Sequence, residues 1–320
     1  MSNEKRMFRP KCLDQFIGQN LIRKNLKVFI ESSLKRQASL DHVLLAGPPG
    51  LGKTTLANII ANELGVNIRV TSGPLITKAG DLAAIISNID ENDVLFIDEI
   101  HRLNSNVEEV LYAAMEDFVL DILIGEGPAA KSVRIELAPF TLIGATTRLG
   151  LISNPLRERF GIPISLDFYR TDDLNEVVKK AAEEFGIDID DTSSMEIAAR
   201  SRGTPRIANR LLRRVHDYSI YNKEKGINIS QTKNSLKELE VDEIGLNALD
   251  YRYLNCIIEN YDGGPAGINA IAASMGEAKD VIEDVVEPYL IQKGLINRTP
   301  RGRTLAKKSF EDLKKRMIEK

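Results

Sequence analysis

The sequence predicts an α/β fold, a parallel sheet with flanking helices, followed by a small helical domain and a winged-helix domain. A glycine-rich segment at residues 47–55 lies between a short apolar run and a helical pattern, an order typical of phosphate-binding α/β domains. Two further apolar runs, at residues 94–97 and 140–145, end in polar residues, as buried parallel strands often do. Beyond residue 170 the pattern becomes helical, and a basic loop between short strand-like segments follows near the C-terminus.

Residues 47–55 match G-x-x-x-x-G-K-[ST], the pattern of phosphate-binding loops, at every fixed position. The glycines let successive backbone N–H groups turn toward phosphate oxygens, and the helix that follows adds its dipole. Lys53 is expected to reach the β- and γ-phosphates, and the Thr54 hydroxyl to bind Mg²⁺. The sequence therefore predicts ATP and Mg²⁺ as cofactors, held by Gly50, Gly52, Lys53, Thr54 and Thr55.

The composition limits the class of protein. The 320 residues, 43% hydrophobic and 28% charged, suffice for two or three domains with ordinary cores. A formal net charge of −3 excludes wholesale electrostatic binding to nucleic acid, so any such contact must be local. Two cysteines far apart, Cys12 and Cys256, provide no disulfide framework. Neither a signal peptide nor a membrane-spanning run is present in the sequence, which predicts a soluble cytoplasmic protein without a membrane partner.

The apolar run at residues 94–97 ends in Asp98 and Glu99. An aspartate at the carboxyl end of a strand beside a phosphate-binding loop can hold a Mg²⁺-bound water, and an adjacent glutamate can orient or deprotonate the attacking water. Asp98 is therefore expected to serve the metal and Glu99 catalysis. A strand followed by a capped helix is the alternative, which the loop upstream disfavours.

Two later segments carry weaker signals. The apolar run at residues 140–145 leads to Thr146, which is expected near the γ-phosphate, although an ordinary strand residue is equally compatible with the pattern. Residues 154–161 carry Arg157 and Arg159 in one helical turn. The planar guanidinium suits the charge of a phosphoryl transition state, and a solvated helix face is the alternative.

In this order the motifs resemble the AAA+ ATPases, and four segments resemble the RuvB family within them, the motors of Holliday junction branch migration. These segments are residues 9–19, 40–53, 97–102 and 291–303, and the resemblance extends over about residues 9–313. The segment 291–303 is the most specific, because other AAA+ families do not share it. The resemblance implies a large AAA+ ATPase domain over 1–169, a small helical lid domain over 170–240 and a winged-helix head over 243–320.

The resemblance also implies roles for single residues. Arg159 corresponds to the finger that reaches into the neighbouring subunit's site, which implies a homo-hexameric ring. Arg206, in the segment 203–206, corresponds to sensor 2, and Thr146 to sensor 1. Contacts to the nucleotide base or at the subunit interface are implied for Phe8, Arg9, Tyr169, Glu116, Asp117 and Phe118.

Residues 121–137 form a further expected element. Two alternating apolar segments, 122–124 and 133–137, flank a Gly/Pro-rich turn and predict a β-hairpin. An elaboration of the core is one interpretation. The resemblance implies the other, in which the hairpin docks a RuvA tetramer that recognises the four-way junction, with RuvC joining the same assembly.

The C-terminal segment shows a separation of charge. Three helical patterns, at residues 254–258, 268–275 and 281–290, precede the basic loop, which is the pattern of a winged helix. The third helix is acidic, with Glu277, Asp280, Glu283, Asp284 and Glu287 against Lys279, so phosphates would repel it. We therefore expect the wing to contact DNA phosphates without strong sequence preference, through Arg298, Arg301 and Arg303, a solvated basic tail being the alternative.

Three functions follow from these patterns. The first is an ATP hydrolase that drives DNA through a Holliday junction in recombination and repair. The second is a clamp-loader-like or regulatory ATP switch acting on protein partners. A third, an ATP-dependent transcription activator, is disfavoured because its hallmark loop sequence is not found in the chain.

Overall fold

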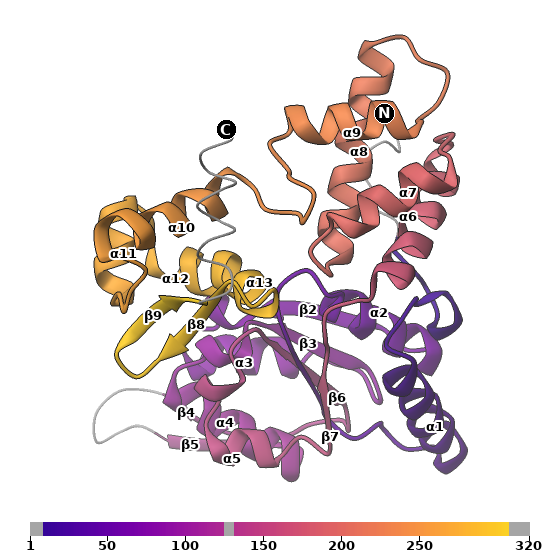
Figure 1. Cartoon of the computed structure of the whole chain (residues 1–320). Coiled ribbons are helices and arrows are strands. Elements are labelled where there is room, and N and C mark those ends of the chain that lie inside the picture. The colour runs from indigo at the N-terminus through magenta and orange to yellow at the C-terminus, as the bar shows by residue number, and fades with distance from the viewer. Residues whose placement is uncertain (1–8, 125–130, 307–320) are drawn as a thin grey trace. The chain divides into compact units, whose positions relative to one another are not determined.

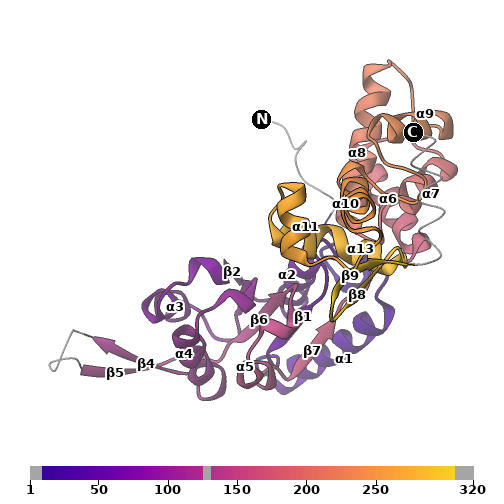
Figure 2. The same ribbon diagram turned by 60° about the vertical axis from the view of Figure 1, so that its left-hand side comes forward.

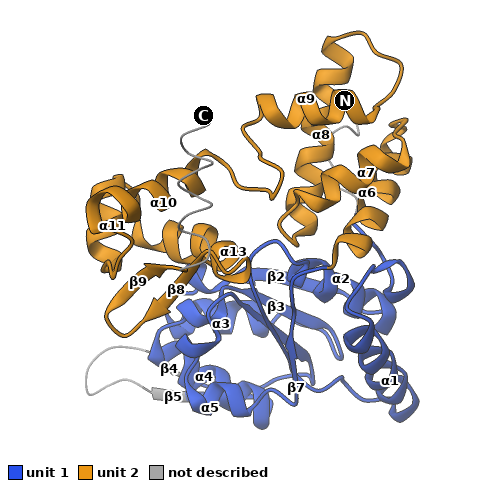
Figure 3. Ribbon diagram, viewed as in Figure 1, with its two compact units in different colours: residues 1–169 blue, residues 170–320 orange. Residues whose placement is uncertain are grey.

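The computed structural model describes residues 9–124 and 131–306, and the chain divides into two compact units, Met1–Tyr169 and Arg170–Lys320 (Figure 3). Unit 1 is an α/β domain, and unit 2 contains helices and one small two-stranded sheet (Figure 1). Within the described ranges, none of the helices combines the length and the apolarity that a bilayer crossing requires.

Unit 1 is built on a parallel five-stranded sheet in the order β2-β3-β6-β1-β7. Every residue of β1 and of β6 is buried, which explains why both strands are rich in apolar residues. Because the strands are parallel, their carboxyl ends lie at one edge, where ligands of open α/β sheets bind. The strands are β1 (Val43–Ala46), β2 (Ile68–Ser72), β3 (Val94–Asp98), β6 (Thr141–Thr146) and β7 (Ile162–Ser165).

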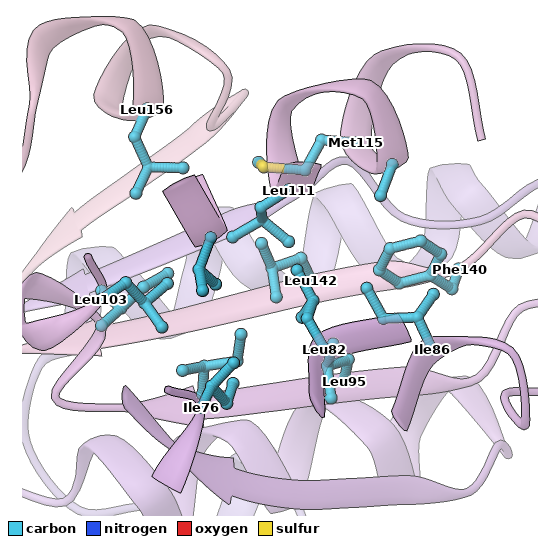
Figure 4. Close-up of a cluster of buried hydrophobic side chains, with 14 of the residues drawn as sticks. Ile76, Leu82, Ile86, Leu95, Leu103, Leu111, Met115, Phe140, Leu142 and Leu156 are labelled. Carbon is cyan, nitrogen blue, oxygen red and sulfur yellow. The ribbon is translucent and has the colours of Figure 1, made fainter. Parts of the chain in front are cut away.

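One core of unit 1 lies between the sheet and two helices, α3 (Ala79–Ile86) and α4 (Ser105–Glu116). Figure 4 shows leucines of β3 and β6 facing apolar side chains of both helices, among them Leu95, Leu142, Leu82, Ile86 and Leu111. The remaining helices of this unit are α1 (Asn20–Arg36), α2 (Lys53–Leu64) and α5 (Asn154–Glu158), with 3-10 turns at Leu13–Gln15, Gly73–Leu75, Ile100–Arg102 and Leu149–Leu151.

The hairpin predicted within residues 121–137 is confirmed. Strands β4 (Val119–Ile124) and β5 (Lys131–Glu136) pair antiparallel and project from the rest of unit 1 (Figure 2). Its base is anchored because Val119 and Leu120 are buried and Leu137 packs against the core. The turn that joins the strands, residues 125–130, lies outside the described residues.

Unit 2 begins with four helices, α6 (Thr171–Phe185), α7 (Asp191–Ala199), α8 (Pro205–Tyr221) and α9 (Ile229–Glu238). Helix α6 buries its apolar stripe, including Leu174, Val177 and Val178. The extended N-cap is Arg170, so Asp172 and Asp173 lie in the first turn, where their charges favour the helix dipole.

The remainder of unit 2 has the winged-helix arrangement. Helices α10 (Ala248–Tyr261) and α11 (Ile268–Met275) precede a third helical stretch, composed of α12 (Lys279–Val281), a π-helical turn (Ile282–Val286) and α13 (Glu287–Gln292). Strands β8 (Ile296–Thr299) and β9 (Gly302–Leu305) then pair antiparallel as the wing. A core of its own, with Tyr253, Leu254, Ile271 and Leu290, holds these elements together.

Candidate functional site

The phosphate-binding loop connects the buried strand β1 to helix α2. Its glycines occupy conformations that other residues rarely adopt, with φ of 141° at Gly47, 83° at Gly50 and 99° at Gly52. At Gly47 a Cβ atom would lie 2.5 Å from the Leu166 backbone oxygen, so the loop path itself requires glycine. Thr54 and Thr55 are half-buried in the first turn of α2. This loop, with a helix N-terminus behind it, has the chemistry to hold phosphate.

Lys53 is held against the loop. Its Nζ donates to the backbone oxygens of Gly47 at 2.7 Å and Pro48 at 2.9 Å, and only 7% of the residue is exposed. Burial lowers the pKa of Lys53 to about 8, although the nearby Asp98 carboxylate opposes that shift.

The lowered pKa of Lys53 predicts a pH-dependent affinity for nucleotide. Phosphate oxygens favour the protonated amine, so ATP binding should raise the pKa of Lys53. Above pH 8 the amine of the unliganded protein is mostly neutral, and the protein should therefore take up a proton when it binds ATP. We expect ATP affinity to fall by about tenfold per pH unit beyond that point. Calorimetric titrations in buffers of different ionisation enthalpy measure the proton uptake. Lys53→Arg is the control, because its guanidinium stays charged and the uptake should disappear.

Asp98 ends β3 and Glu99 follows it, at the same edge of the sheet as the phosphate-binding loop. The Asp98 carboxylate accepts from the Glu99 backbone N–H at 2.9 Å. Glu99 has a left-handed φ of 49°, a strained conformation for a non-glycine residue, and its side chain is 46% exposed. One Glu99 carboxylate oxygen lies 3.3 Å from Arg102. Asp98 thus places a carboxylate near Lys53, and Glu99 places a carboxylate that is partly open to water.

Thr146 ends β6, the strand between β1 and β3, so its position is between the phosphate-binding loop and Asp98 in the sheet order. It is 1% exposed, and its hydroxyl lies 2.9 Å from His101 Nδ1 and accepts from the Arg148 backbone N–H at 2.9 Å. These contacts connect Thr146 to the segment after Glu99. Thr147, half-buried immediately after the strand, places a second hydroxyl at this edge. It was not predicted as a site residue, although two consecutive threonines at the end of the apolar run could have indicated it.

Tyr169 lies beside the phosphate-binding loop. Its hydroxyl donates to the Leu51 backbone oxygen at 3.3 Å, and it is 8% exposed. Arg9 is exposed at the start of the described chain, and Phe8 lies outside the described residues.

Arg159 is half-buried after α5 and contacts other elements than the phosphate-binding loop. Its guanidinium donates to the Pro155 oxygen at 2.8 Å and to Glu116 at 3.1 Å, and it lies 4.5 Å above the Tyr112 ring. Glu116, the last residue of α4, is thereby paired with Arg159. The neighbouring Asp117 is exposed. Phe118 instead packs edge-on against Phe140, so its ring belongs to the core.

The wing arginines are not equivalent. Arg303 is 13% exposed and donates to Glu287 at 2.8 Å and to Glu283 at 2.9 Å. Arg298 is 46% exposed and also pairs with Glu287, whereas Arg301 lies exposed in the turn between the strands. Glu287 itself is fully buried and additionally accepts from the Tyr253 hydroxyl at 2.9 Å. The acidic third helix therefore binds two wing arginines within the domain.

Arg206 lies exposed in the first turn of α8, directly after Pro205. It belongs to unit 2, whereas Lys53, Asp98, Glu99, Thr146 and Tyr169 belong to unit 1.

Comparisons with known proteins cover nearly the whole chain. Residues 8–166 match the family described as the Holliday junction DNA helicase RuvB P-loop domain, residues 169–242 the RuvB AAA lid domain, and residues 243–314 the RuvB C-terminal winged helix domain. A solved structure of the Thermotoga maritima RuvB Holliday junction branch migration motor is 51% identical, with a TM-score of 0.88 over 96% of this chain and 98% of that one. A mutant of the same protein gives 0.90 at 51% identity over 96% and 99%. The chain belongs to the RuvB family of Holliday junction branch-migration ATPases.

Proposed function

We propose that ATP hydrolysis at the carboxyl edge of the unit 1 sheet drives duplex arms of a Holliday junction past the winged-helix head of a ring. The observation that carries this proposal is the placement of Lys53, Asp98 and Glu99 at the same edge of one parallel sheet, in a chain that also carries the family's lid and winged helix. A regulatory switch also binds and hydrolyses nucleotide, so the feature that favours the motor is the winged helix joined to the hydrolytic set.

Each residue of this edge has a distinct task. The loop N–H groups and Lys53 bind the phosphates, and Thr54 and Asp98 would hold Mg²⁺, which neutralises phosphate charge when bound. Glu99 orients the attacking water and accepts its proton. Thr146 fixes the loop after β3 through His101, and Tyr169 and Arg9 border the base.

We propose that the site is completed by other domains and by a second copy of the chain. Arg159 acts as a finger in trans within a homo-hexamer, and Arg206 reaches the phosphates from the lid. Support comes from the position of Arg159, whose hydrogen bonds go to Pro155 and Glu116, beside the exposed end of α4. We also propose the domain limits 1–169, 170–240 and 243–320, and a cytoplasmic location.

The projecting hairpin is proposed to dock a RuvA tetramer, with RuvC joining the same junction complex. Deleting residues 125–130 should abolish the stimulation of ATPase by RuvA, while basal ATPase should persist because the base of the hairpin, which packs against the core, is retained. Steady-state ATPase with and without RuvA measures both. Unchanged stimulation would contradict the docking role.

The wing is proposed to contact DNA mainly through Arg301. Arg301→Ala should weaken binding to junction DNA, because that side chain is exposed. It should also reduce the slope of log affinity against log salt concentration by about one, the value for one lost phosphate contact. Arg303→Ala should instead lower the thermal stability of the head, because it leaves the buried Glu287 short of a partner. Binding titrations across salt concentrations and thermal unfolding separate the two effects. Equal effects of both substitutions on both measurements would contradict this division.

A synthetic four-way junction tests the proposed function directly. The wild-type chain, with RuvA and ATP, should convert the junction to duplex products, and withholding ATP should stop the conversion. ATP hydrolysis without junction conversion under any condition would favour the regulatory switch.

A further inference from the structure

The lid and the winged-helix head, both parts of unit 2, are in contact at the short turn between α7 and α8. Between α7 and α8, Arg202 directs its side chain out of the lid and into the head. Its guanidinium donates to both carboxylate oxygens of Asp250, at 3.0 and 3.1 Å, and lies 4.5 Å above the ring of Tyr289. Arg202 is 7% exposed and the Asp250 side chain 1%, so this ion pair is buried between the two domains.

These contacts fix Arg202 to three separate elements of the head. Asp250 lies in the first turn of α10 and caps it by accepting from the Asn247 N–H at 2.9 Å. Tyr289 belongs to α13, and the Val285 backbone oxygen, 3.4 Å from the guanidinium, belongs to the π-helical turn. A planar guanidinium can bind a carboxylate with two hydrogen bonds and stack on a ring at once, which an ammonium cannot.

The same turn leads directly into the proposed nucleotide sensor. Arg202 and Gly203 both have left-handed φ, 56° and 67°, and the Thr204 hydroxyl donates to the Arg202 oxygen at 3.1 Å. Helix α8 then begins at Pro205, with Arg206 exposed in its first turn. Three residues therefore separate Arg202, whose side chain is bound to the head, from Arg206, whose side chain is proposed to contact phosphate.

The covalent linker between lid and head is also fixed. Arg200 donates to the Val241 oxygen at 2.9 Å, and Asp242 accepts from the Ile244 and Leu246 N–H groups. At Gly245 a Cβ atom would lie 2.7 Å from the Arg200 oxygen, and the Tyr289 hydroxyl donates to the Ile244 oxygen. The contacts of Arg202 and those of the linker therefore both join the lid to the head. This favours movement of the two domains as one body.

Burial raises the pKa of Asp250, and the charge of Arg202 opposes that shift. The arginine therefore keeps the carboxylate ionised, and removing either partner alone would leave an uncompensated buried charge.

We propose that Arg202 is a positioning residue that makes the lid and the head one lever, so that movement of Arg206 with the nucleotide is passed to the wing. This inference rests on the proposed function, because it assumes that Arg206 responds to nucleotide and that the wing contacts DNA. A network of this kind couples sites only if it biases an element with two arrangements. The lever formed by lid and head is that element, and Arg202 makes its two halves move together.

The test uses the full chain with RuvA and a four-way junction. The variant Arg202→Met/Asp250→Asn removes the charges together, so that no buried charge remains unpaired. ATPase and junction affinity should stay within about twofold of wild type, whereas the junction converted per ATP hydrolysed should fall by about tenfold. The matched control is Arg214→Met/Asp217→Asn, an exposed ion pair on α8, which should change none of the three.

A second variant protects the test against misfolding. Arg202→Lys keeps the charge but loses the bidentate contact, so it should fold and show an intermediate loss of coupling. Wild-type junction conversion per ATP in either folded variant would overturn the proposal, as would an equal loss of ATPase and conversion. Failure of the wild-type chain to convert the junction would instead refute the proposed function.

Discussion

Replacing Glu99 with glutamine is expected to slow ATP hydrolysis by about 10²- to 10⁴-fold, the usual contribution of a general base. The amide cannot accept the proton of the attacking water, but it keeps the size of the side chain and the left-handed backbone at φ 49°. ATP binding should therefore persist, because Lys53 and the loop are unchanged. Steady-state phosphate release measures hydrolysis, and equilibrium binding of labelled ATP measures affinity.

Glu91→Gln is the matched control for Glu99. This glutamate is exposed before the amino end of β3, the strand whose carboxyl end leads to Glu99, so the same loss of charge should leave hydrolysis unaffected. Hydrolysis above a tenth of the wild-type rate in Glu99→Gln would remove Glu99 from the role of base. Loss of ATP binding would assign it a structural role instead.

The parts of this fold that could be predicted are those determined by residues close together in the sequence. The loop at 47–55, the acidic end of β3 and the wing follow from local patterns, and the sheet order then brings the first two together. The hairpin predicted over residues 121–137 was also visible, although its first strand begins earlier, at Val119, and its second strand spans Lys131–Glu136. The N-cap of α6 is Arg170, whereas Asp172 and Asp173, whose residue type is typical of N-caps, lie in the first turn. Aspartate in a first turn serves the helix dipole as well as a cap would, so the pattern did not distinguish them.

The parts that could not be predicted depend on partners distant in sequence. Glu287 and Arg303 pair across 16 residues, and Arg202 and Asp250 across 48. From sequence alone the acids of the third helix looked like a surface that repels DNA. In the fold, Glu283 and Glu287 face the wing and pair with Arg303, so part of the positive charge attributed to DNA binding is neutralised within the domain.

Arg159→Ala is expected to slow ATP hydrolysis by about 10³-fold, the lower range for an arginine finger, while ATP affinity remains. The effect on folding should be small, because the pair with Glu116 is partly exposed and such pairs contribute about 0–1 kcal/mol. Phosphate release and thermal unfolding measure these quantities. Arg157→Ala, an exposed arginine one residue before the end of α5, is the control and should retain activity.

Mixing two inactive variants decides whether the finger acts in trans. Arg159→Ala subunits keep an intact phosphate-binding loop, and Lys53→Ala subunits keep an intact Arg159. In a mixed ring, each functional loop that adjoins a Lys53→Ala subunit regains a finger, so hydrolysis should return although neither variant is active alone. A finger acting within its own chain cannot be restored in this way, and mixtures as inactive as their components would exclude the trans arrangement. Recovery that depends on the mixing ratio would also show that the active unit contains more than one copy of the chain.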